Sequence, residues 1–110
     1  MKSADESKTG VSQLTAERLE ASLSKLGAIR VRKMFGGYGV FEEDTMFALI
    51  DKDGGVYFKA DDTNLHKFTT AGSNKHSRMP YYKLPDAVLA NEDDLLDWAQ
   101  SSIAASKKAK

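Results

Sequence analysis

The stretch RKMFGGYGVF, residues 32–41, decides the fold predicted for this chain. The segment 29–35 alternates between apolar and other residues, which is the pattern of a half-buried strand. Gly36-Gly37 then supplies the positive φ values that a two-residue hairpin turn requires. Residues 38–42 return as the second strand. The stretch therefore predicts an antiparallel hairpin.

Turn signals beyond this hairpin extend it into a meander. Glu43-Asp44 and residues 52–55 are polar or glycine-rich turns, and the connections are too short for parallel crossovers. Pro80 marks the last strand as an edge strand, because proline cannot donate to a ladder. The expected elements are a helix over 12–26, strands over 29–35, 38–42, 45–50 and 56–60, a helix over 62–71, a strand over 79–84 and a helix from 91. This order, α-β-β-β-β-α-β-α, predicts a two-layer α+β fold in which helices flank an antiparallel sheet.

Composition indicates one small globular domain. The chain has 110 residues, 41% of them hydrophobic, which suffices for one core. Its 16 basic and 16 acidic residues balance, so net charge gives no reason to expect tight nonspecific binding to nucleic acid. Cysteine is absent and no apolar run approaches the roughly 20 residues of a membrane helix, which predicts a cytoplasmic protein without a membrane partner. We expect a disordered tail over 1–10, a domain over 11–106 and a basic tail over 107–110.

No group of residues predicts a catalytic, cofactor-binding or metal-binding site. The glycines of 36–39 precede a strand, whereas phosphate-binding loops open a helix. His66 and His76 lack the paired spacing of a metal-binding helix, and no nucleophile accompanies them. Residues 51–62 lack the glycine and glutamate that an EF-hand loop needs at its sixth and twelfth positions. We therefore expect a protein that is not an enzyme.

A basic cluster and several tyrosines are the candidates for binding a partner. Arg30 and Arg32 point to one face of their strand, and Lys33 points to the other. A sheet face with arginines and tyrosines could bind single-stranded nucleic acid by phosphate contact and stacking. Alternatively, it is a solvated face that pairs with the acidic segments 42–44 and 51–53, which suits the neutral net charge better. The candidate partner-binding residues are Arg30, Arg32, Lys33, Tyr38, Tyr81 and Tyr82.

Two of the expected strands are apolar on both faces. Residues 47–50 read Phe-Ala-Leu-Ile and residues 56–58 read Val-Tyr-Phe, although a one-sided antiparallel strand should alternate. One face can pack on the helices, and the other must be covered. A second subunit would cover it, which predicts a homodimer. Alternatively, the flanking helices of the same chain wrap around the sheet.

Residues 32–41 also resemble the signature of the N-terminal domain of the TfoX/Sxy competence-regulator family. Four further segments match in order, at 46–49, 56–59, 79–82 and 94–99. The similarity covers about Leu14 to Ala105. Five segments in register make the resemblance specific.

The resemblance implies a two-layer α+β fold similar to secretion chaperones, a homodimer and a bacterial protein. The family's best-known members are positive regulators of competence genes and act as coactivators beside a DNA-bound transcription factor. A non-enzymatic regulatory or adaptor domain is therefore implied, with a transcription factor or polymerase subunit as its partner. Direct binding of nucleic acid through the basic sheet face is the alternative. No catalytic residue, cofactor or metal ligand comes with the family.

Overall fold

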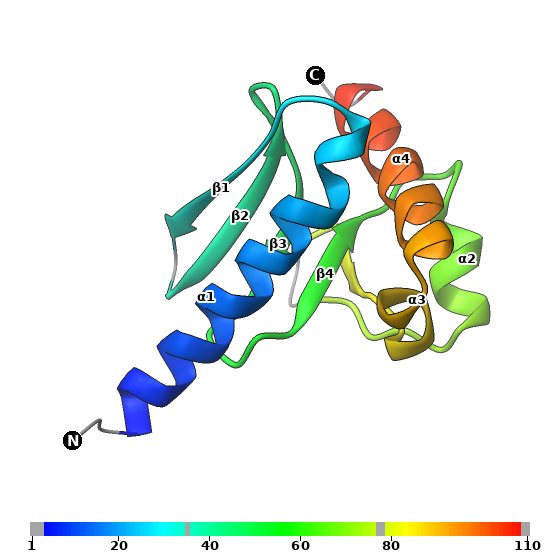
Figure 1. Ribbon diagram of the computed structural model, residues 1–110. Coiled ribbons are helices and arrows are strands. Elements are labelled where there is room, and N and C mark those ends of the chain that lie inside the picture. Colours follow the sequence, from blue (N-terminus) through cyan, green and yellow to red (C-terminus); the bar gives the residue numbers. More distant parts are fainter. Residues whose placement is uncertain (1–3, 35, 77–78, 109–110) are drawn as a thin grey trace.

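The computed structural model describes residues 4–34, 36–76 and 79–108, with side chains from Val11 onward. The elements follow the order α1 (Ala4–Leu23), the 3₁₀ helix η1 (Ser24–Leu26), β1 (Ile29–Met34), β2 (Gly37–Glu42), β3 (Thr45–Ile50), β4 (Val56–Lys59), α2 (Leu65–Thr70), β5 (Tyr81–Lys83), α3 (Asp86–Ala90) and α4 (Glu92–Lys108). Figure 1 shows the long helices α1 and α4 lying against the sheet. The predicted α+β class is confirmed.

The five strands pair antiparallel in chain order, from β1 at one edge to β5 at the other. Val40 pairs with Ala48, and Ala48 pairs in turn with Phe58. Residues that pair directly across neighbouring strands point to the same face of the sheet. These three side chains therefore form a row that packs against the helices. β5 follows Pro80 and is an edge strand, as that proline predicts.

The core lies between this row and the helices α1 and α4. Ala16, Leu19 and Leu23, which lie on one stripe of α1, are at most 2% exposed. The rings of Phe47 and Phe58 meet edge to face with their centroids 6.0 Å apart, an arrangement that aromatic pairs favour. One continuous core therefore holds the sheet to its helical layer.

The two glycines of the first hairpin are required for different structural reasons. Gly36 has a φ of 78°, the left-handed value that glycine adopts most readily. Gly37 does not turn the chain, because it already pairs with Met34 in the ladder. A Cβ on Gly37 would overlap the carbonyl oxygen of Ile50, so close approach of β3 explains this glycine. The prediction that both glycines form the turn is wrong for Gly37, and Phe35 lies outside the described residues.

A β-bulge explains most of the two-sided apolar character of β3. Val40 pairs with Ala48 but the next residue, Phe41, pairs with Met46, so Phe47 has no partner across the ladder. A bulge turns two successive side chains toward similar directions, and both Phe47 and Ala48 are 0% exposed. Helices of the same chain thus cover more of this strand than simple alternation predicts.

The first two α-helices begin at different residues from those predicted. α1 begins at Ala4 rather than Ser12, so residues 4–10, expected within a disordered tail, are helical and extend past the sheet in Figure 1. The segment contains no proline to stop the helix. α2 begins after Asn64 instead of being capped by Asp62. A turn occupies the preceding residues, in which the Asp61 carboxylate accepts a hydrogen bond from the Thr63 N–H at 2.8 Å.

The last helix is capped by Asn91 and buries a stripe of mostly small side chains. Asn91 accepts a hydrogen bond from the Asp94 N–H at 3.0 Å, which satisfies one free donor of the first turn. Leu96 and Ile103 of this helix are only partly buried. The buried residues of α4 are Leu95, Ala99, Ser102, Ala105 and Ser106. Small side chains allow α4 to approach the sheet closely, and hydrophobicity alone does not reveal such a face. The short helix α3 was not predicted.

Trp98, the single tryptophan, joins α4 to α2. Its ring meets Phe68 edge to face at 4.9 Å between centroids. The Lys67 ammonium lies 5.7 Å from the Trp98 centroid and 3.3 Å from the Asp97 carboxylate. Trp98 thus packs against the core with part of its ring exposed.

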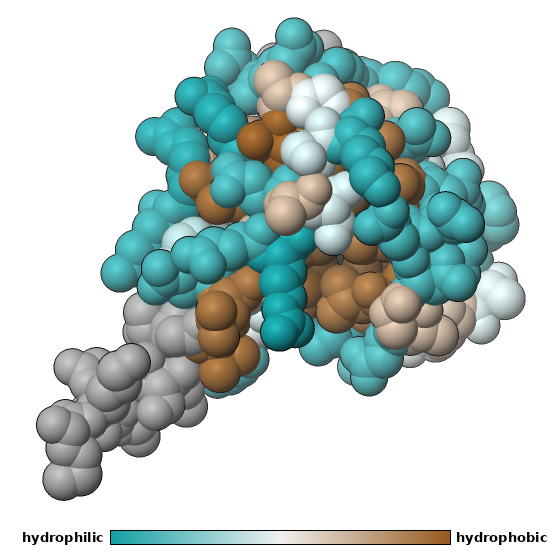
Figure 2. All heavy atoms as spheres, viewed as in Figure 1, coloured by the Kyte–Doolittle hydropathy of each residue, from teal (hydrophilic) through white to brown (hydrophobic). Residues whose placement is uncertain are grey.

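An exposed apolar area lies on the helical side of the molecule. Among the side chains that the structure describes, the exposed large apolar ones are Val11, Leu14 and Leu89, at 49%, 58% and 37%. We call these three residues the helical patch. A hollow of about 390 Å³ that includes Leu89 lies beside it. Figure 2, which views this side, shows apolar surface along α1 and between α1 and α3.

Candidate partner-binding face

The sheet has a second face that none of the described helices covers. Strand alternation and register place on it a set of side chains that contact one another across all five strands. We call this surface the outer face. Its residues are Arg30, Arg32, Met34, Gly39, Phe41, Met46, Leu49, Tyr57, Lys59, Tyr81 and Lys83.

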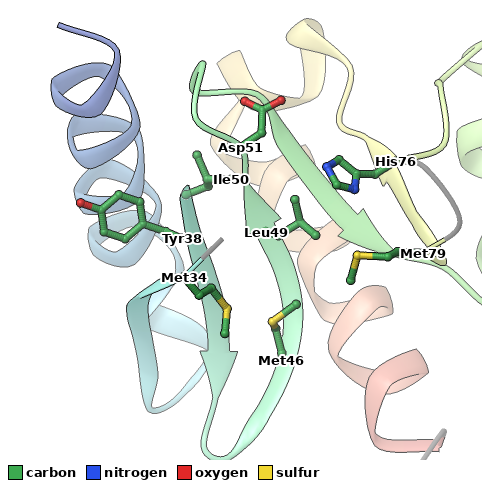
Figure 3. A pocket seen from close by; sticks show the side chains of 8 residues that line it. All are labelled: Met34, Tyr38, Met46, Leu49, Ile50, Asp51, His76 and Met79. Atoms are coloured by element: carbon green, nitrogen blue, oxygen red, sulfur yellow. The ribbon is translucent and has the colours of Figure 1, made fainter. Parts of the chain in front are cut away.

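Methionines form an apolar hollow at the centre of the outer face. We call it the methionine hollow, and it is bounded mainly by Met34, Met46, Leu49 and Met79, which point toward a common space in Figure 3. Its volume is about 190 Å³. Gly39 makes room for it, because a Cβ there would stand 2.5 Å from Met34 Sδ and 3.0 Å from Met46 Sδ. Methionine is flexible and polarizable, so such a hollow adapts to the shape of what enters it.

Cations lie over aromatic rings on either side of the hollow. On β1, the Arg32 guanidinium lies 5.8 Å from the Phe41 centroid. On the other side, Lys59 lies over Tyr81 at 5.6 Å. The third pair, Lys83 over Tyr57, has a distance of 5.5 Å. Cation–π contacts at such distances hold the charged groups above the sheet.

These three cations form no ion pair with a described carboxylate, because none of Arg32, Lys59 and Lys83 has one within 4 Å, the limit for an ion pair. Asp51 nevertheless lies near Lys83: Asp51 Oδ2 and Lys83 Nζ are 2.9 and 3.0 Å from the point where a Cβ on Gly55 would stand. Arg30 does reach Asp44, at 3.6 Å, but both side chains are mostly exposed, and such pairs contribute little to stability. The outer face is therefore apolar at its centre and positive on both flanks.

One end of the methionine hollow is polar. Asp51 Oδ1 accepts hydrogen bonds from the N–H groups of Asp53 and Gly55 at 3.0 and 2.7 Å, which orients the carboxylate. Burial raises the pKa of Tyr57, and the charge and hydrogen bond of Asp51 raise it further. The Tyr57 ring meets His76 edge to face at 4.7 Å. These groups hold one another and close that end of the hollow.

Tyr81 belongs to the outer face, but its side chain is buried there. It is 4% exposed, and burial raises its pKa to about 12. Its hydroxyl donates a long hydrogen bond of 3.4 Å to the Met46 carbonyl. This tyrosine supports the methionine hollow and stays neutral over the physiological range of pH.

The structure brings together only part of the predicted site. Arg30, Arg32 and the buried Tyr81 belong to the outer face. Tyr38 and Tyr82 pack against the core on the helical side, and the Tyr38 ring points toward α1 in Figure 3. Tyr38 nevertheless also lines the methionine hollow. The remaining candidate, Lys33, is exposed on the same side of β1 as Val31.

Several residues of the outer face were not proposed from the sequence. The methionines and Leu49 were unnoticed because their grouping depends on strand register. Lys59 and Lys83 carried a usable signal, since each alternates with an aromatic residue of the core side.

Within the described part of the chain, no three histidine or acidic side chains come together in a way that could hold a metal ion. In the same ranges, no helix has both the length and the apolar character to cross a membrane. The outer face offers apolar contact and positive charge.

Comparison with known proteins identifies the family. A model of the TfoX N-terminal domain matches residues 21–106. A search of the curated proteins finds no match. The matched segment contains all five strands, the helices α2 and α3 and most of α4. Since it spans most of the chain, this protein belongs to the TfoX N-terminal domain family.

Proposed function

We propose that this domain is a non-enzymatic regulatory or adaptor module that binds another protein through the outer face. The observation that carries the proposal is the open sheet face, with its methionine hollow between Arg32 and the lysines Lys59 and Lys83. An apolar centre with a polar surround is typical of protein interfaces, and methionine and arginine are enriched there. Membership of the family supports a regulatory role.

The proposed partner class follows from the family. TfoX-type regulators of competence genes are coactivators, so a transcription factor or a polymerase subunit is the partner that we propose. Such a role requires the domain to work in the cytoplasm of a bacterial cell. Whether competence genes are the regulated set depends on which partner the outer face binds.

Site-specific photo-crosslinking in the source cell tests the proposal. A photo-reactive amino acid replaces Leu49 on the outer face in one version and the exposed Gln100 of α4 in the other. We expect discrete protein adducts from position 49 and none of the same mass from position 100. Equal adduct patterns at the two positions would show that the outer face has no dedicated protein partner.

Nucleic-acid binding through Arg30, Arg32 and Lys33 is the second candidate. The cations on the outer face favour it, because phosphate contacts release counterions and bind strongly at low salt. The split of the three residues between two faces of β1 weighs against it. An anisotropy titration of labelled single-stranded DNA and RNA decides, since this candidate requires binding at low salt that falls steeply as salt is added.

A further inference from the structure

We propose that the outer face recognises an acidic protein segment, with one large apolar side chain in the methionine hollow and carboxylates against Arg32, Lys59 and Lys83. This inference rests on the proposed function and specifies its partner chemistry. Three properties of the face carry it: the size of the hollow, the placement of the cations and the burial of the aromatic rings.

The size of the methionine hollow selects its occupant. Drug-sized ligands and cofactors occupy pockets of roughly 300–1,000 Å³, whereas this hollow has about 190 Å³. Met34, Met46, Leu49 and Met79 offer mainly apolar contact, and Asp51 stands only at one end. A single leucine, phenylalanine or tryptophan side chain matches this space and polarity. An anchor of this type, seated in a desolvated pocket, typically supplies much of the binding energy of a protein interface.

The cations define how the anchoring segment lies. Arg32 is on β1, one edge of the sheet, and Lys83 is on β5, the other edge. Four inter-strand spacings of about 4.8 Å separate these strands by roughly 19 Å. About six extended residues or about 13 helical residues span that distance. A segment that crosses the strands can therefore place its anchor near the centre and carboxylates at both ends.

The buried rings exclude stacking with bases. Binding of single-stranded nucleic acid relies on aromatic rings that bases can stack upon. Tyr81 is 4% exposed, and Phe41 and Tyr57 are half-buried with Arg32 and Lys83 above them. The cations cover the rings, so the outer face presents charge and apolar surface without a stacking platform.

The charge pattern also excludes a second copy of this face as the occupant. A two-fold symmetric dimer places the same patch on both sides of its interface. Arg32, Lys59 and Lys83 of one copy would then meet a surface that carries the same cations and a single oriented carboxylate, Asp51. An acidic segment complements this surface, whereas an identical surface repels it.

Peptide selection tests the inference directly. The full chain is presented to a displayed library of random peptides of about 15 residues, long enough to cross the sheet in either conformation. We expect the enriched peptides to share a large apolar residue flanked by aspartate or glutamate. An enrichment without acidic residues, or no enrichment over the unselected library, would overturn the inference.

Matched variants show where the selected peptides bind. Arg32→Ser with Lys83→Gln removes two cations of the outer face, and Arg18→Ser with Lys25→Gln removes the same charges from exposed positions on the helices. We expect about a tenfold or greater loss of affinity in the first variant and less than about a twofold change in the second. Leu49→Gln should weaken binding comparably, with Leu14→Gln as its control. Circular dichroism verifies that each variant is folded. Equal affinities in the paired variants would also overturn the inference.

Two further outcomes separate this inference from the proposed function. Photo-crosslinking could give protein adducts at position 49 while the selected peptides lack acidic residues. That combination would support the outer face as a protein interface and reject an acidic segment as its ligand. Labelled single-stranded DNA or RNA could instead bind the wild-type chain and fail to bind the Arg32→Ser, Lys83→Gln variant. That result would reject both the acidic segment and the protein partner in favour of nucleic acid.

Discussion

Met34 Sδ lies 2.5 Å from the position that a Cβ on Gly39 would occupy, across the first hairpin. The methionine thus fills the space that a larger residue at position 39 would need. Gly37, two residues earlier, faces a backbone carbonyl of Ile50 at still closer range. One glycine lies under a flexible side chain and the other under a fixed backbone.

This contrast predicts different costs for the same substitution. Gly39→Ala should lower the free energy of unfolding by about 1 kcal/mol, because the ends of the neighbouring methionines can move aside. Gly37→Ala should lower it by about 3 kcal/mol, since the carbonyl of Ile50 can move only if β3 moves. Urea unfolding measures both values. Equal costs at the two positions would contradict the distinction.

Alkaline pH should destabilise the fold through Tyr81. Burial raises the pKa of Tyr81 from 10.0 to about 12, so the unfolded chain ionises first. The contribution of this tyrosine is complete below pH 10 and is lost as the pH rises toward 12, at roughly 2–3 kcal/mol in total. Tyr81→Phe should flatten the fall in unfolding free energy across this range.

The flattening should be partial, because other groups shift in the same direction. A hydrogen bond to Glu42 raises the pKa of Lys107, whose ion pair with that carboxylate measures 2.6 Å. This pair stabilises the fold below pH 10.5 and weakens as the pH rises through the raised pKa of the lysine. Urea unfolding in steps from pH 9 to pH 12 compares the variants. An identical pH profile for wild type and Tyr81→Phe would contradict the assignment.

Asn64 should be the most sensitive polar residue of the domain. It is 1% exposed, accepts a hydrogen bond from the Asp61 N–H at 2.7 Å and donates to the Lys59 carbonyl at 3.1 Å and the Ser101 hydroxyl at 3.3 Å. Asn64→Ala leaves these groups without their partner, which should cost about 2–3 kcal/mol. Asn91→Ala, which removes the exposed cap of α4, should cost only about 1 kcal/mol. Thermal unfolding ranks the two, and the reverse order would contradict the argument.

We expect a homodimer that associates through the helical patch and leaves the outer face free, whereas the sequence alone placed the second subunit against the sheet. Val11, Leu14 and Leu89 are the exposed large apolar side chains among those described. We expect light scattering at tens of micromolar to give the mass of a dimer, and Leu14→Glu to give that of a monomer. Leu49→Glu on the outer face serves as the control and should leave the mass unchanged. A monomeric wild-type chain would contradict the prediction.

The order and pairing of the strands could be predicted because short-range signals set them. The glycines at 36–37 and 54–55 and the proline at 80 mark the connections and one edge of the sheet. The residues at which helices begin could be predicted less well from the sequence. The turn at Asp61–Asn64 competes with a helix start at Asp62, and only its hydrogen bonds decide between them.

The outer face could be predicted only in part, since its assembly depends on register. Arg30 and Arg32 share a face by alternation within one strand. The meeting of Met34 with Met46 needs the pairing of three strands, and Met79 arrives from a loop. The bulge at Phe47 shifts the alternation of β3 by one residue, which no local pattern reveals.

Trp98 gives the domain its one tryptophan fluorophore, and its location decides what tryptophan emission reports. The indole packs on Phe68 beside α2, with the sheet between it and the methionine hollow. Its emission should change when α4 detaches from the core but remain constant when a ligand occupies the opposite surface. Optical titrations of complex formation therefore need a label on the ligand, whereas unmodified protein suffices for denaturation curves.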